Sequence, residues 1–210
     1  MMILLATMLI TASANGQTLP TGNEDAEAPV FKSETVHEFL QKNLNYPHKA
    51  RMRETQGVVI VDFAVDSDGR LSDFSVINSV SPLVDKEVIR AIKETNGQWE
   101  PGSVDGKPVK MHKEISVTFK LYPESDFVKF AKRSFDKGTR LLYEKQNPEK
   151  ALKYLNHAIR YIPYDKSIVW TRAVCKRALG DHQGAEKDRA RLETLENRAD
   201  EESREFYVIK

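Results

Sequence analysis

Hydrophobic periodicity divides this chain into a mixed first half and a helical second half. Apolar residues recur at helical spacing from Val36 to Leu44. The period then changes to two in a strand from Val58 to Asp66, in which Val59, Val61, Phe63 and Val65 share one face. The turn residues Asp66 to Arg70 join this strand to a second alternating run, Leu71 to Asn78. The two runs therefore predict an antiparallel hairpin.

A helix and a third strand complete the first half. Ser81-Pro82 is typical of a helix start, and the apolar spacing extends that helix to near Gly97. A loop rich in Gly and Pro follows, and then comes the cleanest alternation in the chain, with Ile115, Val117, Phe119 and Leu121 facing inward and Glu114, Ser116, Thr118 and Lys120 facing outward to solvent. Because an isolated hairpin is only marginally stable, we expect an α+β domain over residues 30–122. Its three-stranded antiparallel-type sheet has helices packed on one face.

The entry into the first strand contains a Tyr-Pro pair and a glycine. The residue before Pro avoids the α region, so Tyr46-Pro47 is expected to end one helix and to start a second, short one. Gly57 is expected to end that second helix. Two interpretations of Tyr46 and Trp99 stay open, namely packing in a small core and contact with a ligand.

The second half carries a repeat. Phe135 and Ala151 recur 34 positions later as Val169 and Ala185, and 34 residues is the tetratricopeptide spacing. We therefore predict two tetratricopeptide-like repeats over residues 126–200 and a tail over 201–210; two helical hairpins without repeat ancestry are the alternative. Two repeats bury little core by themselves, so we expect them to lean on the first domain or on the tail residues Phe206 to Ile209.

The amino terminus has the pattern of an export signal. An apolar block from Ile3 to Ile10 precedes Ala12-Ser13-Ala14, a small-residue cleavage pattern, which predicts a signal peptide over residues 1–16. No Lys or Arg precedes the block, and a buried N-terminal helix is the alternative. The polar residues 17–29 are expected to form a flexible linker. If residues 1–16 are a signal peptide, we expect the chain to be exported to the periplasm, and to be membrane-associated only if this terminus is retained.

Composition excludes several classes of function. Lys and Arg number 32 against 31 Asp and Glu, so no basic field favours nucleic acid as a partner. The single cysteine, Cys175, excludes an intrachain disulfide, and the five histidines are not spaced as metal ligands. There is also no nucleophile with a nearby base and no phosphate-binding glycine loop. We therefore expect a protein that is not an enzyme and that needs no cofactor.

A resemblance rests on the order and spacing of short motifs across residues 30–121. This part of the chain resembles the C-terminal domain of TonB, the periplasmic energy transducer, in the version common in Bacteroidetes-type proteins. The motifs that carry the resemblance are, in order, Tyr46-Pro47, Ala50, Gly57, Phe63, Asp68-Gly69-Arg70, Val76, Ala91, Trp99, Pro101-Gly102, Gly106-Lys107-Pro108-Val109 and Phe119.

The resemblance implies a periplasmic domain that binds a short extended segment, the TonB box, of TonB-dependent outer-membrane transporters. In the family this segment adds beside the last strand, so main-chain groups supply most of the attraction. The residues that the resemblance assigns to peptide binding are Asn43, Asn45, Tyr46, Glu114, Ile115, Ser116, Val117, Thr118, Phe119 and Lys120.

The chain departs from the transducer in its spacer. Residues 17–29 reach at most about 45 Å when fully extended, which is too short for force transmission from an inner-membrane motor. We therefore predict an adaptor linked to TonB-dependent transmembrane transport, with the helical repeats making a second protein contact. The alternative is an envelope scaffold that oligomerises, for example as a homodimer, through strand edges and repeats without a transport role.

Overall fold

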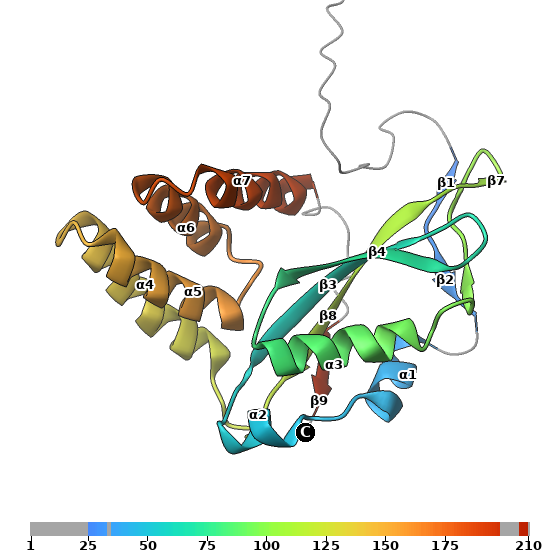
Figure 1. The fold of residues 1–210 in the computed structure, drawn as a ribbon, viewed down its shortest axis with the longest axis horizontal. Helices are drawn as coiled ribbons and strands as arrows, with labels where there is room; N and C mark the ends of the chain where they lie inside the picture. The colour runs from blue at the N-terminus through green and yellow to red at the C-terminus, as the bar shows by residue number, and fades with distance from the viewer. Residues whose placement is uncertain (1–24, 33–34, 198–205, 210) are drawn as a thin grey trace, which may run out of the picture.

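The computed structural model describes residues 25–32, 35–197 and 206–209 (Figure 1). The predicted signal peptide, 1–16, and most of the predicted linker lie outside these residues. The helices are α1 (Val36–Asn43), α2 (His48–Met52), α3 (Pro82–Lys93), α4 (Phe127–Tyr143), α5 (Pro148–Tyr161), α6 (Lys166–Ala178) and α7 (His182–Asn197). The strands are β1 (Ala26–Glu27), β2 (Val30–Phe31), β3 (Gly57–Val65), β4 (Leu71–Asn78), β5 (Trp99–Glu100), β6 (Ser103–Val104), β7 (Lys107–Pro108), β8 (Met111–Phe119) and β9 (Phe206–Ile209).

The main sheet has four strands in the order β4-β3-β8-β9. Strand β3 pairs antiparallel with β4 on one side and with β8 on the other, where Val61 faces Ile115. The predicted α+β class and its three antiparallel strands are thereby confirmed. The fourth strand, β9, comes from the end of the chain and pairs with β8 in parallel, from Ser116 opposite Phe206 to Phe119 opposite Ile209.

One face of the sheet forms the core of the first half. The inward residues of β3 and β8 pack with α1 and α3, which lie over this face (Figure 1). Trp99 is buried here, and its indole Nε1–H donates a 2.8 Å hydrogen bond to Thr95 Oγ1. Helix α3 begins as predicted, because the Ser81 side chain accepts a hydrogen bond from the amide of Val84 and Pro82 occupies the first turn. These contacts hold β8 against β3 and α3.

The second face of the sheet is also buried, although the alternation in β8 predicts that this face is exposed to solvent. Val58 and Ile60 of β3 are buried, and so are Ser116 and Thr118 of β8. The expectation that these two β8 residues face solvent is therefore wrong. The reason is that α5, the α5–α6 connection and α7 pack over this face and replace solvent there.

Helices α4 to α7 pack in chain order, each against the next. Ala151 and Ala185, the small residues that match at the repeat spacing, are both buried. Asp188 on α7 is buried and pairs with Arg172 and Lys176 of α6 at 2.6 and 2.8 Å. The repeat ancestry of these helices stays a prediction. Within the described residues, no helix combines the length and the apolar character that a membrane span requires.

Two short segments differ from the predicted organisation. Ala26–Glu27, expected within the linker, forms β1 and pairs with β6. Gly57, expected to end the second helix, is the first residue of β3, whereas α2 already ends at Met52. The tail Phe206–Ile209 contacts the sheet and α1.

Candidate peptide-binding edge

The outer edge of β8 is the place where the predicted peptide would add. Strand β3 pairs with β8 along its whole length, whereas β9 pairs on the other side only from Ser116 to Phe119. Helix α1 lies against β9 and so flanks the same edge (Figure 1). The edge therefore accepts an added strand, and in this structure the added strand belongs to the chain itself.

The side chains of β8 are engaged on both faces of the sheet. Ile115, Val117 and Phe119 are buried in the core with α1 and α3. Lys120 follows the strand, and its Nζ lies 5.9 Å from the ring centroid of Phe127 on α4. What β8 can offer an incoming peptide is therefore mainly its backbone, as strand addition requires.

Glu114, one of the residues predicted to bind the peptide, joins the two halves of the chain. Arg191 of α7 donates hydrogen bonds to both carboxylate oxygens of Glu114, at 2.6 and 3.0 Å. The hydroxyl of Tyr164 donates a third, at 3.2 Å. The guanidinium carbon of Arg191 also lies 5.4 Å from the ring centroid of Tyr164. Burial raises the pKa of Tyr164, and the negative charge of Glu114 raises it further, so the phenol stays protonated and can donate.

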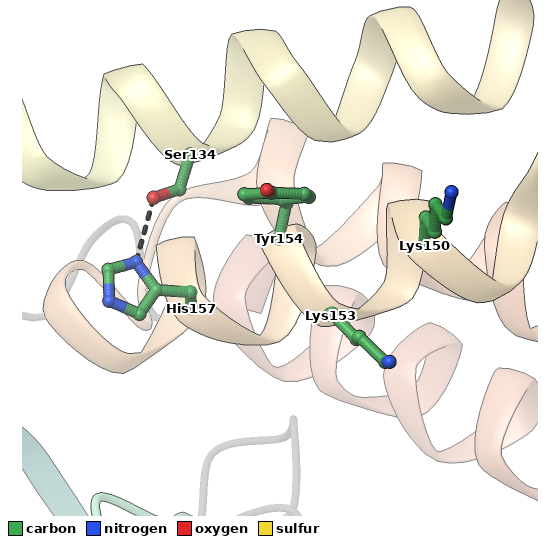
Figure 2. A pocket seen from close by; sticks show the side chains of 5 residues that line it. All are labelled: Ser134, Lys150, Lys153, Tyr154 and His157. Carbon is green, nitrogen blue, oxygen red and sulfur yellow. Dashed lines mark hydrogen bonds between the residues drawn. The ribbon is translucent and has the colours of Figure 1, made fainter. Parts of the chain in front are cut away.

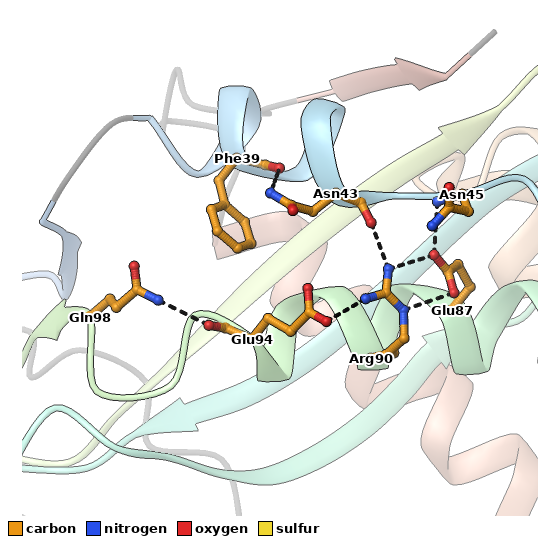
Figure 3. A network of polar contacts seen from close by, with 7 residues as sticks. All are labelled: Phe39, Asn43, Asn45, Glu87, Arg90, Glu94 and Gln98. Carbon is orange, nitrogen blue, oxygen red and sulfur yellow. Dashed lines mark hydrogen bonds and ion pairs between the residues drawn. The ribbon is translucent and has the colours of Figure 1, made fainter.

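Asn43 is the last residue of α1, Asn45 lies in the connection from α1 to α2, and the backbones of both are anchored to α3 (Figure 3). Arg90 Nη2 donates to the carbonyl of Asn43 at 2.6 Å, and the amide of Asn45 donates to Glu87 Oε1 at 2.8 Å. The Asn43 side chain donates to the carbonyl of Phe39. This network fixes the connection relative to α3.

Glu87 is the acidic centre of this network. Burial alone would raise its pKa, but hydrogen bonds from Arg90 and from the amide of Asn45 outweigh that effect and hold the pKa below its ordinary value. Glu87 is therefore ionised at neutral pH and keeps its two partners in place.

Tyr46 packs against the end of β8. Its ring centroid lies 5.2 Å from that of Phe119 in an edge-on arrangement, and its hydroxyl donates a 2.5 Å hydrogen bond to the carbonyl of Thr55. Burial raises the pKa of Tyr46 to about 12. Of the two interpretations, the structure shows the packing role, and it brings Tyr46 and β8 together.

The helical half has a separate pocket of about 470 Å³ between α4 and α5 (Figure 2). Ser134 Oγ lies 2.7 Å from His157 Nδ1 at one end. Lys137 Nζ lies 4.4 Å from the ring centroid of Tyr154. The pocket is lined by two lysines and an aromatic ring among its residues, which are Ser134, Lys150, Lys153, Tyr154 and His157. Across the described part of the chain, no group of three or more His, Cys, Asp or Glu residues could hold a metal ion.

Sequence reasoning missed the elements that complete this region. Arg191 lies in a helix of mixed charges, which is typical of a solvated face. The run Phe206 to Ile209 is rich in residues that favour strands, and this was the available indication of β9.

Comparison with known proteins gives matches over the first half of the chain. Residues 42–121 match the family model described as Gram-negative bacterial TonB protein C-terminal. The chain is 28% identical over 107 residues to Protein TonB of Haemophilus influenzae; the match covers 50% of this chain and 37% of that protein. It therefore spans little more than a third of the length of this curated relative.

Two solution structures of the Helicobacter pylori TonB C-terminal domain are also similar. The longer one, residues 179–285, is 20% identical with a TM-score of 0.34, and the likeness covers 42% of this chain and 79% of that one. The shorter one, residues 194–285, is 22% identical with a TM-score of 0.33, and the likeness covers 45% and 100%. Residues 42–121 are therefore similar to the TonB C-terminal family.

Proposed function

We propose that this chain is a periplasmic adaptor, linked to TonB-dependent transport, that captures an extended segment of an outer-membrane transporter. The segment would be of the TonB-box kind and would add to the outer edge of β8. One observation carries the proposal: this edge already accepts a parallel strand over Ser116 to Phe119. The family match over residues 42–121 supports the same assignment.

The chemistry of the edge suits this kind of recognition. Because the β8 side chains are engaged in packing and ion pairs, the attraction for an added strand comes from main-chain hydrogen bonds. Tyr46 packs on Phe119, and the anchors from α3 hold the residues before it. The binding edge is therefore supported on a rigid frame.

The helical half would make the second protein contact of the adaptor. The pocket between α4 and α5 presents Lys150 and Lys153 beside Tyr154, which suits an acidic segment with an apolar residue. Because α7 is joined to β8 through Glu114, a partner on these helices would be held close to the transporter segment.

The test is calorimetric titration of the intact chain with TonB-box peptides from the transporters of its own host. We expect binding, with amide shifts in nuclear magnetic resonance spectra at Ser116 to Phe119. Absence of binding for every peptide, together with a stable oligomer in light scattering, would instead favour the envelope scaffold. For the second contact, Lys150→Glu with Lys153→Glu should abolish binding of an acidic partner while peptide binding at β8 stays unchanged.

A further inference from the structure

The edge of β8 is occupied by the chain's own last strand. Strand β9 pairs in parallel with Ser116 to Phe119, which are four of the residues predicted to bind the peptide. The strand is only 4 residues long, and it lies at the end of the sheet order with β8 as its single neighbour there. A strand this short has few main-chain hydrogen bonds, so it can be displaced.

The fold keeps this strand near its binding edge. Helix α7 is joined to β8 by the pair of Arg191 with Glu114, and Glu114 lies two residues before the first β8 residue that pairs with β9. In the sequence, α7 ends at Asn197 and β9 begins at Phe206, and the few residues between them can span at most roughly 28 Å. A short tether of this kind gives an effective concentration of about a millimolar. The strand therefore returns readily to the edge after it leaves.

We propose that β9 is a built-in competitor for the peptide-binding edge, so that an external segment binds only when β9 leaves. This inference rests on the proposed function, because it concerns the same edge. The affinity for an external peptide is then reduced by the fraction of molecules in which the edge is open. With an open state of about 10% or less, removal of β9 tightens peptide binding about tenfold or more.

The test compares four forms of the full chain by calorimetry with one TonB-box peptide. They are the unaltered chain, a form that lacks residues 206–210, and two double variants. The proline pair is Tyr207→Pro with Val208→Pro, and the threonine pair is Tyr207→Thr with Val208→Thr. The proline pair removes backbone donors from β9, whereas the threonine pair keeps both the donors and the preference for strands. We expect the deletion and the proline pair to bind about tenfold more tightly or better, and the threonine pair to bind like the unaltered chain.

A variant in which a disulfide holds β9 on β8 tests the same competition, because here the edge should stay closed to the peptide. Thr118 and Val208 are direct partners, and neighbouring strands are spaced about 4.8 Å apart, within the range that a disulfide bridges. The oxidised double variant Thr118→Cys with Val208→Cys should not bind the peptide, and reduction should restore binding. Cys175 is buried in the helical half, so the native thiol stays outside this disulfide.

Hydrogen exchange separates this inference from the proposed function. Without peptide, deletion of 206–210 should speed amide exchange within Ser116 to Phe119. Three outcomes would each contradict the proposal that β9 competes for the edge. They are unchanged amide exchange, equal peptide affinity with and without β9, and a dimer in which β9 pairs with a second copy of the chain. Faster exchange with no peptide binding in any form would overturn the proposed function and leave β9 as a cap of the edge.

Discussion

Arg191 and Glu114 form a two-point ion pair that fixes α7 to the second face of the sheet. Both side chains are nearly removed from solvent, at 13% and 5% exposed. Charges buried in this way are costly unless each keeps its partner. The pair therefore joins the helical half to β8, in addition to the packing of α5 on the same face.

Replacing either partner by Ala should destabilise the chain strongly, because the other charge stays buried and unpaired. We expect Glu114→Ala or Arg191→Ala to lower the free energy of unfolding by about 3–5 kcal/mol. The double variant should lose less than the sum, with a coupling of about 0.5–3 kcal/mol. Urea unfolding followed by circular dichroism measures all three. The control is Arg189→Ala, whose pair with Glu186 is 49% and 64% exposed and should be worth under about 1 kcal/mol.

Gly57 should not tolerate a methyl group. Its φ is +150°, and a Cβ there would lie 2.6 Å from Arg160 Cγ and 2.8 Å from the Arg160 carbonyl oxygen of α5. We expect Gly57→Ala to cost roughly 2–4 kcal/mol, from backbone strain together with displacement of α5. Gly106→Ala is the matched control, because its φ is also positive, at +71°, and a Cβ there would meet nothing within 4 Å. A loss at Gly57 no larger than that at Gly106 would contradict the close approach of α5.

Tyr46→Phe separates packing from ligand contact at the start of the first domain. The variant keeps the ring against Phe119 and loses only the hydrogen bond to Thr55, so stability should fall by about 0.5–1.5 kcal/mol. Peptide affinity, measured by calorimetry, should stay within about twofold. A larger loss of affinity than of stability would show that the hydroxyl contacts the ligand.

The order of the helices and of the three long strands in the first half followed from periodicity and end signals alone, whereas the short strands β1, β2, β5, β6 and β7 were not predicted. The strand through Val61 and the helix that begins at Pro82 are local patterns, so sequence reasoning placed them close to their observed bounds. The role of Gly57 was missed, because the atoms that forbid a side chain there belong to Arg160, about a hundred residues later in the chain.

The site was harder to predict for the same reason. Alternation shows that Glu114 and Ser116 lie on the face opposite Ile115, but it does not show whether solvent or another domain covers that face. Likewise, the run Phe206 to Ile209 indicates a strand without indicating which edge it joins. Both features are long-range contacts, which hydrophobic periodicity does not encode.

The network around Glu87 should make stability depend on pH in the acid range. Because hydrogen bonds from Arg90 and Asn45 hold the folded-state pKa of Glu87 below its ordinary value of 4.5, its contribution is complete above that value. The contribution is lost as the pH falls through the folded-state pKa, where the carboxylate takes up a proton.

Glu87→Gln tests this dependence directly. At neutral pH we expect a loss of roughly 1.5–3 kcal/mol, the range for hydrogen bonds to a charged group, and the difference between the variant and the unaltered chain should shrink as the pH falls through the folded-state pKa of Glu87. Urea unfolding at a series of pH values measures both curves. Glu94→Gln is the control, since Glu94 pairs with the same Arg90 but is 48% exposed, so its loss should stay under about 1 kcal/mol. Parallel curves for the unaltered chain and Glu87→Gln would mean that Glu87 does not anchor Asn45 through its charge.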